Sequence, residues 1–290
     1  MILVTGSTGH LGTATIDFLL SKGIEANRIV ALARNAKKAE RISSKGVQVR
    51  LGDYTDYASL KSAFTNVEKL LLISSSDLQG RAEQHENVIN AAAEVGVKHI
   101  VYTSFLRKNE TSTSPIAFIA QQHLETEKSL KASGIPYTLM LNGLYADVLP
   151  GFFGDTVLET GVFLPAGKGK AAFTARLDMA EAAASILTTE GHESKEYIIA
   201  NTENTDLYQI AAILGEISGK QVNYLNPTKE TYLETVTKAG LPQEYAEMFA
   251  SFSQAIDQGE FETYKTDLKD LLGRNPTSIG DFLKQVYFQN

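Results

Sequence analysis

The sequence predicts an α/β fold in which a doubly wound parallel sheet is followed by a smaller C-terminal α/β lobe. Two observations support this prediction. Short apolar runs alternate with amphipathic helical patterns as far as Leu141, and the rhythm then breaks into a segment rich in glycine and aromatic residues. Parallel strands buried on both faces appear as such apolar runs, and their alternation with helices is typical of right-handed crossovers.

The first dozen residues contain a glycine-rich turn between a strand and a helix. Residues 2–4 are apolar, glycines stand at positions 6, 9 and 12, and a helical pattern runs over 10–22. Gly6 allows a tight turn, Gly9 lets the backbone approach a pyrophosphate, and Gly12 lets the helix pack close to the strand. The start of the helix offers unpaired N–H groups to phosphates. The turn therefore predicts a Rossmann-type dinucleotide site; the alternative is an ordinary glycine-rich turn.

The rest of the sheet domain repeats this pattern. Further strands are predicted at residues 28–34, 47–51, 69–73, 98–104 and 137–141. Between them we expect a helix capped by Asp56 and helices over 83–95 and 117–131. Because ligands of such sheets bind beyond the carboxyl ends of the strands, we expect the functional residues to lie at those ends.

The C-terminal half is predicted to form a smaller lobe. Residues 143–169 predict loops and a short hairpin, and beyond them we expect helices over 178–188 and 207–218 and a strand over 196–200. The predicted domains are a dinucleotide-binding domain over 1–142, with later returns near 170–200, and a substrate lobe over 143–290 that is interwoven with it.

Composition argues against several classes of function. Cysteine is absent and the five histidines show no metal-ligand spacing, so no metal site is expected. A net charge of −7 without a Lys/Arg block argues against binding to nucleic acid or anionic lipid. No apolar run is long enough to span a bilayer, and the first strand begins at Met1, so we expect a cytoplasmic protein without a cleaved signal.

The end of the second predicted strand favours NADP(H) over NAD(H). In NAD-binding folds an acidic residue about 20 positions past the glycines binds the ribose 2′-hydroxyl. This chain has Arg34 there, with Lys37 and Lys38 close behind. A guanidinium binds a 2′-phosphate that a carboxylate would repel, although a solvated arginine is the alternative. Asp53, at the end of the third strand, is either an acceptor for the adenine amino group or a turn cap.

Short motifs occur in a specific order along nearly the whole chain. They are Thr5-Gly-Ser-Thr-Gly-His-Leu-Gly12, Ala33-Arg34-Asn35, Gly52-Asp53-Tyr54, Leu72-Ile-Ser-Ser-Ser76, Gln84-His-Glu-Asn-Val-Ile-Asn-Ala-Ala92, Tyr102-Thr-Ser104, His123-Leu-Glu-Thr-Glu127-Lys128, Asn142-Gly-Leu-Tyr145 and Leu271-Leu-Gly-Arg-Asn-Pro-Thr-Ser-Ile279. This ordered set resembles the NmrA-like branch of the atypical short-chain dehydrogenases/reductases. Within that branch it is most similar to the NAD(P)H-dependent quinone oxidoreductases, with triphenylmethane reductases as near relatives.

The resemblance implies a cleft between the two lobes that holds the nicotinamide and the substrate. It places the cofactor against Gly6, Ser7, Thr8, Gly9, His10, Leu11, Gly12, Arg34, Lys38, Asp53, Tyr54, Ser74, Ser75, Ser76, Thr103, Ser104, His123, Asn142 and Gly143. Asn142, Gly143 and Tyr145 would lie on the nicotinamide or substrate side. One departure is Leu144, where members of the family often have tryptophan, and we expect the smaller side chain to change how a flat substrate stacks.

The predicted catalytic residues are His123, Tyr145 and Asn142. Classical members use a Tyr-x-x-x-Lys pair on the helix after the fifth strand, but here that helix carries His123 and Glu127 at the matching spacing. We expect His123 to orient ligands or donate a proton while Glu127 fixes its tautomer; a surface His–Glu pair is the alternative. Tyr145 is a second proton donor or a stacking wall, or else an ordinary loop aromatic.

These features predict hydride transfer from NADPH to a quinone-type acceptor. Quinone reduction mainly requires two rings held face to face and water excluded, because the hydroquinone anion can take its proton from water. Two alternatives are a non-catalytic NAD(P)-binding redox sensor of the NmrA type and a reductase of imine or triarylmethane compounds. The oligomeric state stays open, with a homodimer as one alternative.

Overall fold

The central element of the computed structural model, which describes residues 1–77 and 80–288, is a seven-stranded parallel sheet. Its strand order is β3-β2-β1-β4-β5-β6-β9, and every neighbouring pair is parallel. The strands are β1 Ile2–Val4, β2 Ile29–Ala33, β3 Gln48–Leu51, β4 Lys69–Leu72, β5 His99–Phe105, β6 Tyr137–Asn142 and β9 Lys195–Ile199. The order reverses between β1 and β4, so the switch point of this doubly wound α/β fold lies there, as the sequence predicted.

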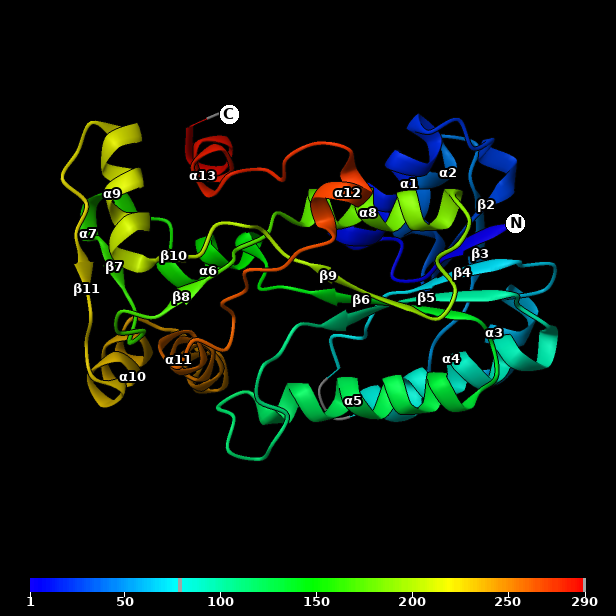
Figure 1. The fold of residues 1–290 in the computed structure, drawn as a ribbon, viewed down its shortest axis with the longest axis horizontal. Helices are drawn as coiled ribbons and strands as arrows, with labels where there is room; N and C mark the ends of the chain where they lie inside the picture. Colours follow the sequence, from blue (N-terminus) through cyan, green and yellow to red (C-terminus); the bar gives the residue numbers. More distant parts are fainter. Residues whose placement is uncertain (78–79, 289–290) are drawn as a thin grey trace.

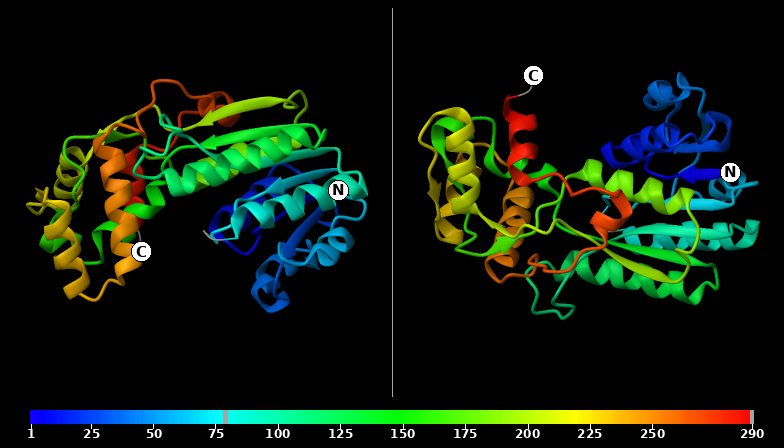
Figure 2. Two further views of the ribbon diagram at one scale, coloured as in Figure 1. Left: turned by 90° about the horizontal axis from the view of Figure 1, so that it is seen from below. Right: turned by 45° about the horizontal axis from the view of Figure 1, so that its top comes forward.

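Helices cover both faces of the sheet (Figures 1 and 2). One face carries α1 (His10–Ser21), α8 (Arg176–Thr188) and α12 (Leu268–Leu272), and the other carries α3 (Tyr57–Ala63), α4 (Arg81–Val95) and α5 (Ala117–Ala132). The connection from β2 to β3 contains η1 (Ala26–Arg28), η2 (Ala36–Ala39) and α2 (Glu40–Ser43). Because side chains alternate along a strand, Leu3 enters the core on the α4 side, whereas Val4 enters the core on the α1 side.

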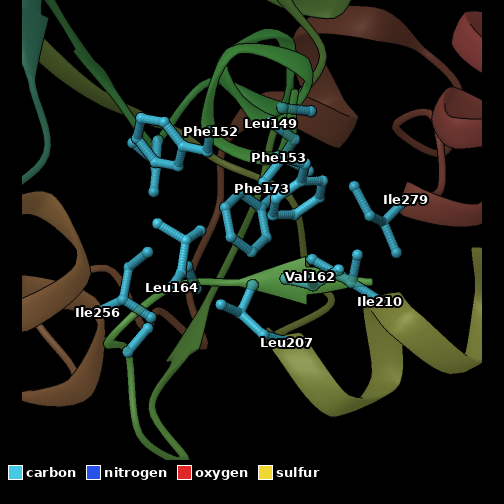
Figure 3. Packing of buried hydrophobic residues seen from close by; sticks show 14 of the residues in the cluster. Leu149, Phe152, Phe153, Val162, Leu164, Phe173, Leu207, Ile210, Ile256 and Ile279 are labelled. Carbon is cyan, nitrogen blue, oxygen red and sulfur yellow. The ribbon is translucent and has the colours of Figure 1, made fainter. Parts of the chain in front are cut away.

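The C-terminal lobe has a hydrophobic core of its own (Figure 3). Phe153, Phe173, Leu207 and Ile256 are among its buried side chains. Its elements are η3 (Ala146–Val148), α6 (Leu149–Phe153), α7 (Val157–Thr160), β7 (Val162–Phe163), β8 (Lys170–Ala171), β10 (Thr205–Asp206), α9 (Leu207–Ser218), β11 (Tyr224–Leu225), α10 (Lys229–Lys238), α11 (Gln243–Asp257) and α13 (Ile279–Phe288). Between these elements the chain returns to the sheet twice, first as α8 and β9 and then as α12, so the two lobes are interwoven.

The prediction of a hairpin within residues 143–169 is wrong. That stretch contains the short helices α6 and α7, with Pro150 in the first turn of α6, where its missing N–H is tolerated. Strand β7 pairs in parallel with β11, and β8 pairs antiparallel with β10. Both partner strands come from beyond residue 200, and a local sequence pattern contains no information about such distant pairing.

The other predicted elements agree with the structure to within a few residues. Asp56 caps α3 by accepting a hydrogen bond from the backbone N–H of Ser59 at 3.1 Å. Helix α4 begins two residues earlier than predicted, at Arg81, which brings that side chain to the edge of the sheet. None of the helices in the described ranges combines the length and the apolar character needed to cross a bilayer.

Candidate functional site

The turn after β1 depends on the small size of its glycines. Gly6 has φ +55°, in the left-handed region that favours glycine. A Cβ atom on Gly12 would lie 2.4 Å from the carbonyl oxygen of Gly6, so only glycine lets α1 start this close to β1. Gly9 is the N-cap of α1, and no side chain in the described part of the chain caps that helix. The first N–H groups of α1 are therefore available to an anion.

A cavity of about 570 Å³ opens beside this turn, at the carboxyl ends of β1 to β4. It lies at the switch point of the sheet, where the fold is expected to bind its ligand. The predicted cofactor residues among those that line it are Gly6, Thr8, Gly9, Arg34, Lys38, Asp53, Tyr54, Ser74, Ser75 and Ser76. The side chains of Arg34 and Lys38 are exposed, as a site for a phosphate group requires.

Other predicted cofactor residues lie beneath the cavity surface. Ser7 is fully buried, and its hydroxyl donates a hydrogen bond to the carbonyl oxygen of Leu32 at 2.7 Å. Leu11 packs in the core below α1. The Thr103 hydroxyl accepts a hydrogen bond from the backbone N–H of Ser74 at 2.9 Å. These side chains hold the turn and the loop after β4 in place and do not line the cavity.

Asp53 has the turn-capping role that was one of its two alternatives. Its Oδ1 atom accepts hydrogen bonds from the backbone N–H of Thr55 at 2.9 Å and from the Thr55 hydroxyl at 2.8 Å. The backbone bond is the main reason why the pKa of this carboxyl is lowered. An adenine contact by Asp53 stays a prediction.

His123 is buried and held in one tautomer. Its Nδ1 lies 2.7 Å from the Tyr102 hydroxyl, and its Nε2 lies 3.5 Å from Nη1 of Arg81. Because a guanidinium can only donate, Nε2 accepts and Nδ1 carries the proton. Burial, with a smaller contribution from Arg81, lowers the pKa of His123 well below its ordinary value. With 5% of its surface exposed and the Phe105 ring stacked at 5.7 Å, His123 is not a surface residue, so that alternative is wrong.

The prediction that Glu127 fixes the tautomer of His123 is also wrong. Glu127 accepts hydrogen bonds from Nη1 and Nη2 of Arg107, both at 2.9 Å, and another from the Ser104 hydroxyl. A bidentate Arg–carboxylate pair is stronger than a neutral imidazole–carboxylate contact, so the loop arginine takes the carboxylate that helical spacing had assigned to His123. The Ser104 hydroxyl thus donates its hydrogen bond within this cluster of Arg107 and Glu127.

The segment after β6 contains the other predicted catalytic residues. Asn142 is fully buried, and its Nδ2 donates to the Tyr145 hydroxyl at 3.4 Å. Within the described ranges, Oδ1 of Asn142 has no partner. Burial raises the pKa of Tyr145, so its phenol is protonated at neutral pH. A Cβ on Gly143 would lie 3.1 Å from Cβ of Ala200, so the chain is tightly packed here.

Leu144 is a buried side chain. Only 4% of it is exposed, and it packs in the core of the C-terminal lobe. Its size therefore affects the packing of the lobe, and an effect on how a flat substrate stacks stays a prediction.

Sequence reasoning missed two arginines beside these residues. Arg81 is buried, and its Nε donates to the carbonyl oxygen of Ser75 at 2.7 Å. Arg176 donates from Nη1 to Nδ1 of His10 at 2.8 Å, and its guanidinium lies 5.2 Å from the centroid of the Tyr145 ring. Both arginines are the first residue of a helix, where the helix dipole disfavours a cation. Because the sequence predicted these helices to begin at residues 83 and 178, it carried no signal for this placement.

Comparison with known proteins agrees with this geometry. The sequence model of the NmrA-like family matches residues 1–283. Quinone oxidoreductase 2 of Escherichia coli is 43% identical over 292 residues, which cover 100% of each chain. The structure of this NADPH-dependent quinone oxidoreductase in complex with NADPH superimposes with a TM-score of 0.92 at 41% identity, over 99% of this chain and 100% of that one.

A second solved relative is the triphenylmethane reductase of Citrobacter sp. in complex with NADP(H). It superimposes with a TM-score of 0.91 at 38% identity and covers 98% of this chain and 99% of its own. The glycine turn, the strand order and the position of the cavity are thus accompanied by full-length similarity to reductases of one group. On these grounds the chain belongs to the NmrA-like family.

Proposed function

We propose that this protein is an NADPH-dependent quinone oxidoreductase. The observation that carries the proposal is the 43% identity, over the full length of both chains, to an Escherichia coli enzyme of that description. The redox-sensor alternative is not favoured, because no sensor is among the relatives described above. The dye-reductase alternative is less favoured, because the triphenylmethane reductase is 38% identical, against 41% and 43% for the quinone oxidoreductase. Bound NADPH supplies the hydride, and a quinone-type small molecule accepts it.

The residues of the cavity fit such a dinucleotide. The uncapped start of α1 after Gly9 suits the pyrophosphate, and the missing Cβ of Gly12 lets that helix start close to β1. We assign Arg34 and Lys38 to the 2′-phosphate, since both are exposed cations on the cavity wall. The remaining cavity residues that were predicted from the sequence are assigned to the adenosine half.

We assign orientation and the exclusion of water, not proton donation, to His123, Asn142 and Tyr145. His123 is neutral because burial lowers its pKa, and the phenol of Tyr145 has a raised pKa, so neither is a strong acid at neutral pH. The hydroquinone anion then takes its proton from water. Since the pKa of His123 is lowered and that of Tyr145 is raised, we expect neither residue to change kcat between about pH 6 and pH 8. A pH–rate profile with an inflection near 6.5 that His123→Gln removes would contradict this assignment.

A spectrophotometric assay of NADPH oxidation with 1,4-benzoquinone tests the function. We expect turnover that depends on the quinone, with NADPH preferred over NADH. Tight NADPH binding without turnover on any benzoquinone or naphthoquinone would overturn the proposal and favour the sensor. The same assay with a triarylmethane dye shows whether the cleft also accepts a larger cationic ring system.

We also propose the division into a nucleotide-binding domain over 1–142, with returns near 170–200, and a substrate lobe over 143–290. The support is that the lobe has its own core, separate from the two cores that flank the sheet. A cytoplasmic location and a homodimer stay predictions, which fractionation of cells and sedimentation of the purified protein would test.

A further inference from the structure

Arg176 connects the two lobes at the glycine turn. It is the first residue of α8, which packs beside α1 on the sheet (Figure 1) although the chain reaches it from the C-terminal lobe. Its Nη1 donates to Nδ1 of His10, the first residue of α1, at 2.8 Å. Its guanidinium also covers the ring of Tyr145 at 5.2 Å. The side chain therefore spans the distance between the start of α1 and the segment after β6.

The backbone holds Arg176 in this position by several long-range bonds. Its N–H donates to Oδ2 of Asp147 at 2.8 Å, which satisfies the start of α8. Just before it, Thr174 pairs with the 144–146 segment: Thr174 N–H donates to the carbonyl of Leu144, and Ala146 N–H donates to the carbonyl of Thr174, both at 2.9 Å. The location of the guanidinium is thus set by the junction of the lobes and not by a mobile loop.

The partners of the Arg176 guanidinium differ from those of Arg107 and Arg274. Arg107 pairs with Glu127 and Arg274 pairs with Asp178, each through a carboxylate within 2.9 Å. Within the described part of the chain, the Arg176 guanidinium bonds to the His10 imidazole in place of a carboxylate, and its buried Nε has no partner. The Arg176 guanidinium thus has an unused donor beside the uncapped start of α1, and this position lacks an anion.

We propose that Arg176 binds the pyrophosphate of the dinucleotide from the C-terminal side of the cleft, opposite the glycine turn. This inference rests on the proposed function only in that the bound molecule is a dinucleotide. A phosphate group at the start of α1 lies next to His10, so the guanidinium that already touches His10 can supply two parallel donors to it. The same side chain covers Tyr145, so cofactor binding at the pyrophosphate also fixes one wall of the acceptor site.

Three ligands separate a pyrophosphate contact from contacts at either end of the cofactor. They are NADPH, 2′-phospho-ADP-ribose, which lacks the nicotinamide, and adenosine 2′-monophosphate, which lacks the pyrophosphate. Calorimetry measures the affinity for each ligand. We expect Arg176→Met to lower the affinities for NADPH and 2′-phospho-ADP-ribose by roughly ten- to a hundredfold, as for a lost hydrogen bond between charged groups. The affinity for adenosine 2′-monophosphate should not change. Arg176→Lys keeps a positive charge without the planar fork and should show the same pattern with a smaller loss.

Arg28→Met is the matched control, because it removes the same charge from the opposite edge of the sheet, where the Arg28 side chain is 64% exposed. It should bind all three ligands as the wild type does. The proposal is overturned if Arg176→Met, or Arg176→Lys where the methionine variant does not fold, binds 2′-phospho-ADP-ribose with wild-type affinity. It is also overturned if adenosine 2′-monophosphate loses as much affinity as NADPH. No quinone is present, so a failure of the proposed turnover leaves this result intact.

Discussion

Helices α1 and α9 begin with nearly the same backbone conformation, but a side chain caps the start of α9 and none in the described residues caps the start of α1. Each has 12 residues and follows a strand, and the N-cap dihedrals are nearly equal, with φ −85° and ψ 168° at Gly9 and φ −89° and ψ 169° at Asp206. At α9 the Asp206 carboxylate accepts from the N–H of Gln209 at 2.8 Å, while the Gln209 side chain accepts from the N–H of Asp206 at 3.0 Å. At α1 no described side chain caps the helix.

The difference shows that a helix start whose N–H groups have no capping side chain can serve as a binding site. A capping box satisfies the orphan N–H groups at the start of a helix and stabilises the protein. Helix α1 does without that contribution and is held by packing, with Leu11, Ile16 and Leu19 buried against the sheet. Its free N–H groups are then available for the phosphates of a cofactor. Four substitutions test this comparison, and two more serve as their controls.

The largest effect is expected for Gly12→Val, which fills the space that lets α1 approach β1. Its Cβ would meet the backbone oxygen of Gly6 at 2.4 Å, and a backbone atom cannot move away as a side chain can. We expect the free energy of unfolding to fall by about 3 kcal/mol or more and NADPH binding to be lost. Urea unfolding measures the first quantity. Gly151→Ala, at a helical glycine with no atom near its Cβ position, should be tolerated.

Gly9→Asp gives α1 the cap that α9 has. Because Gly9 has an N-cap backbone with negative φ, aspartate fits there, although its Cβ lies 3.3 Å from the oxygen of Gly6. We expect the free energy of unfolding to change by less than about 1 kcal/mol. NADPH should bind at least about a hundredfold more weakly, since the carboxylate takes the phosphate's donors and repels it.

Gly9→Ala separates these two effects, because it adds the same Cβ without the carboxylate. If alanine weakened NADPH binding as much as aspartate does, steric contact and not capping would explain the loss, and the comparison with α9 would fail.

Asp206→Ala removes the cap from α9 alone. We expect the free energy of unfolding to fall by about 1 kcal/mol, the usual effect of losing an N-cap side chain. The affinity for NADPH, measured by calorimetry, should not change, because α9 starts in the C-terminal lobe, away from the cavity beside α1. A parallel loss of NADPH affinity would mean that the two helix starts are coupled.

Asp206→Gly should have the smallest effect, because it gives α9 the same N-cap residue as α1. Glycine replaces a capping side chain with a loss of only a few tenths of a kcal/mol, since water reaches the exposed N–H groups. Denaturant unfolding of this variant beside Asp206→Ala resolves the difference. The variant should bind one NADPH per chain and no second one; a second site would show that an open helix start is by itself sufficient.

Most of the fold followed from the sequence because its elements are local. The apolar runs that became β1 to β6 are short and bounded by turn residues, and the stripe of Leu11, Thr15 and Leu19 on α1 has helical spacing. The cavity residues at the strand ends were predictable for the same reason, since parallel strands bring their carboxyl ends to one edge. The pairing of β7 with β11 was not, because the two segments are far apart in the sequence.

The sequence by itself determined the sheet, the glycine turn and the basic residues beside it, because backbone conformation and burial periodicity are local properties. Only the tertiary structure decided which partner each buried polar group takes. Glu127 paired with Arg107, 20 positions away, and not with His123 at helical spacing, while Arg176 bonds to His10 across 166 positions. Such choices depend on competition between donors and acceptors that come together only after the chain has folded, so their outcome has no local sequence pattern.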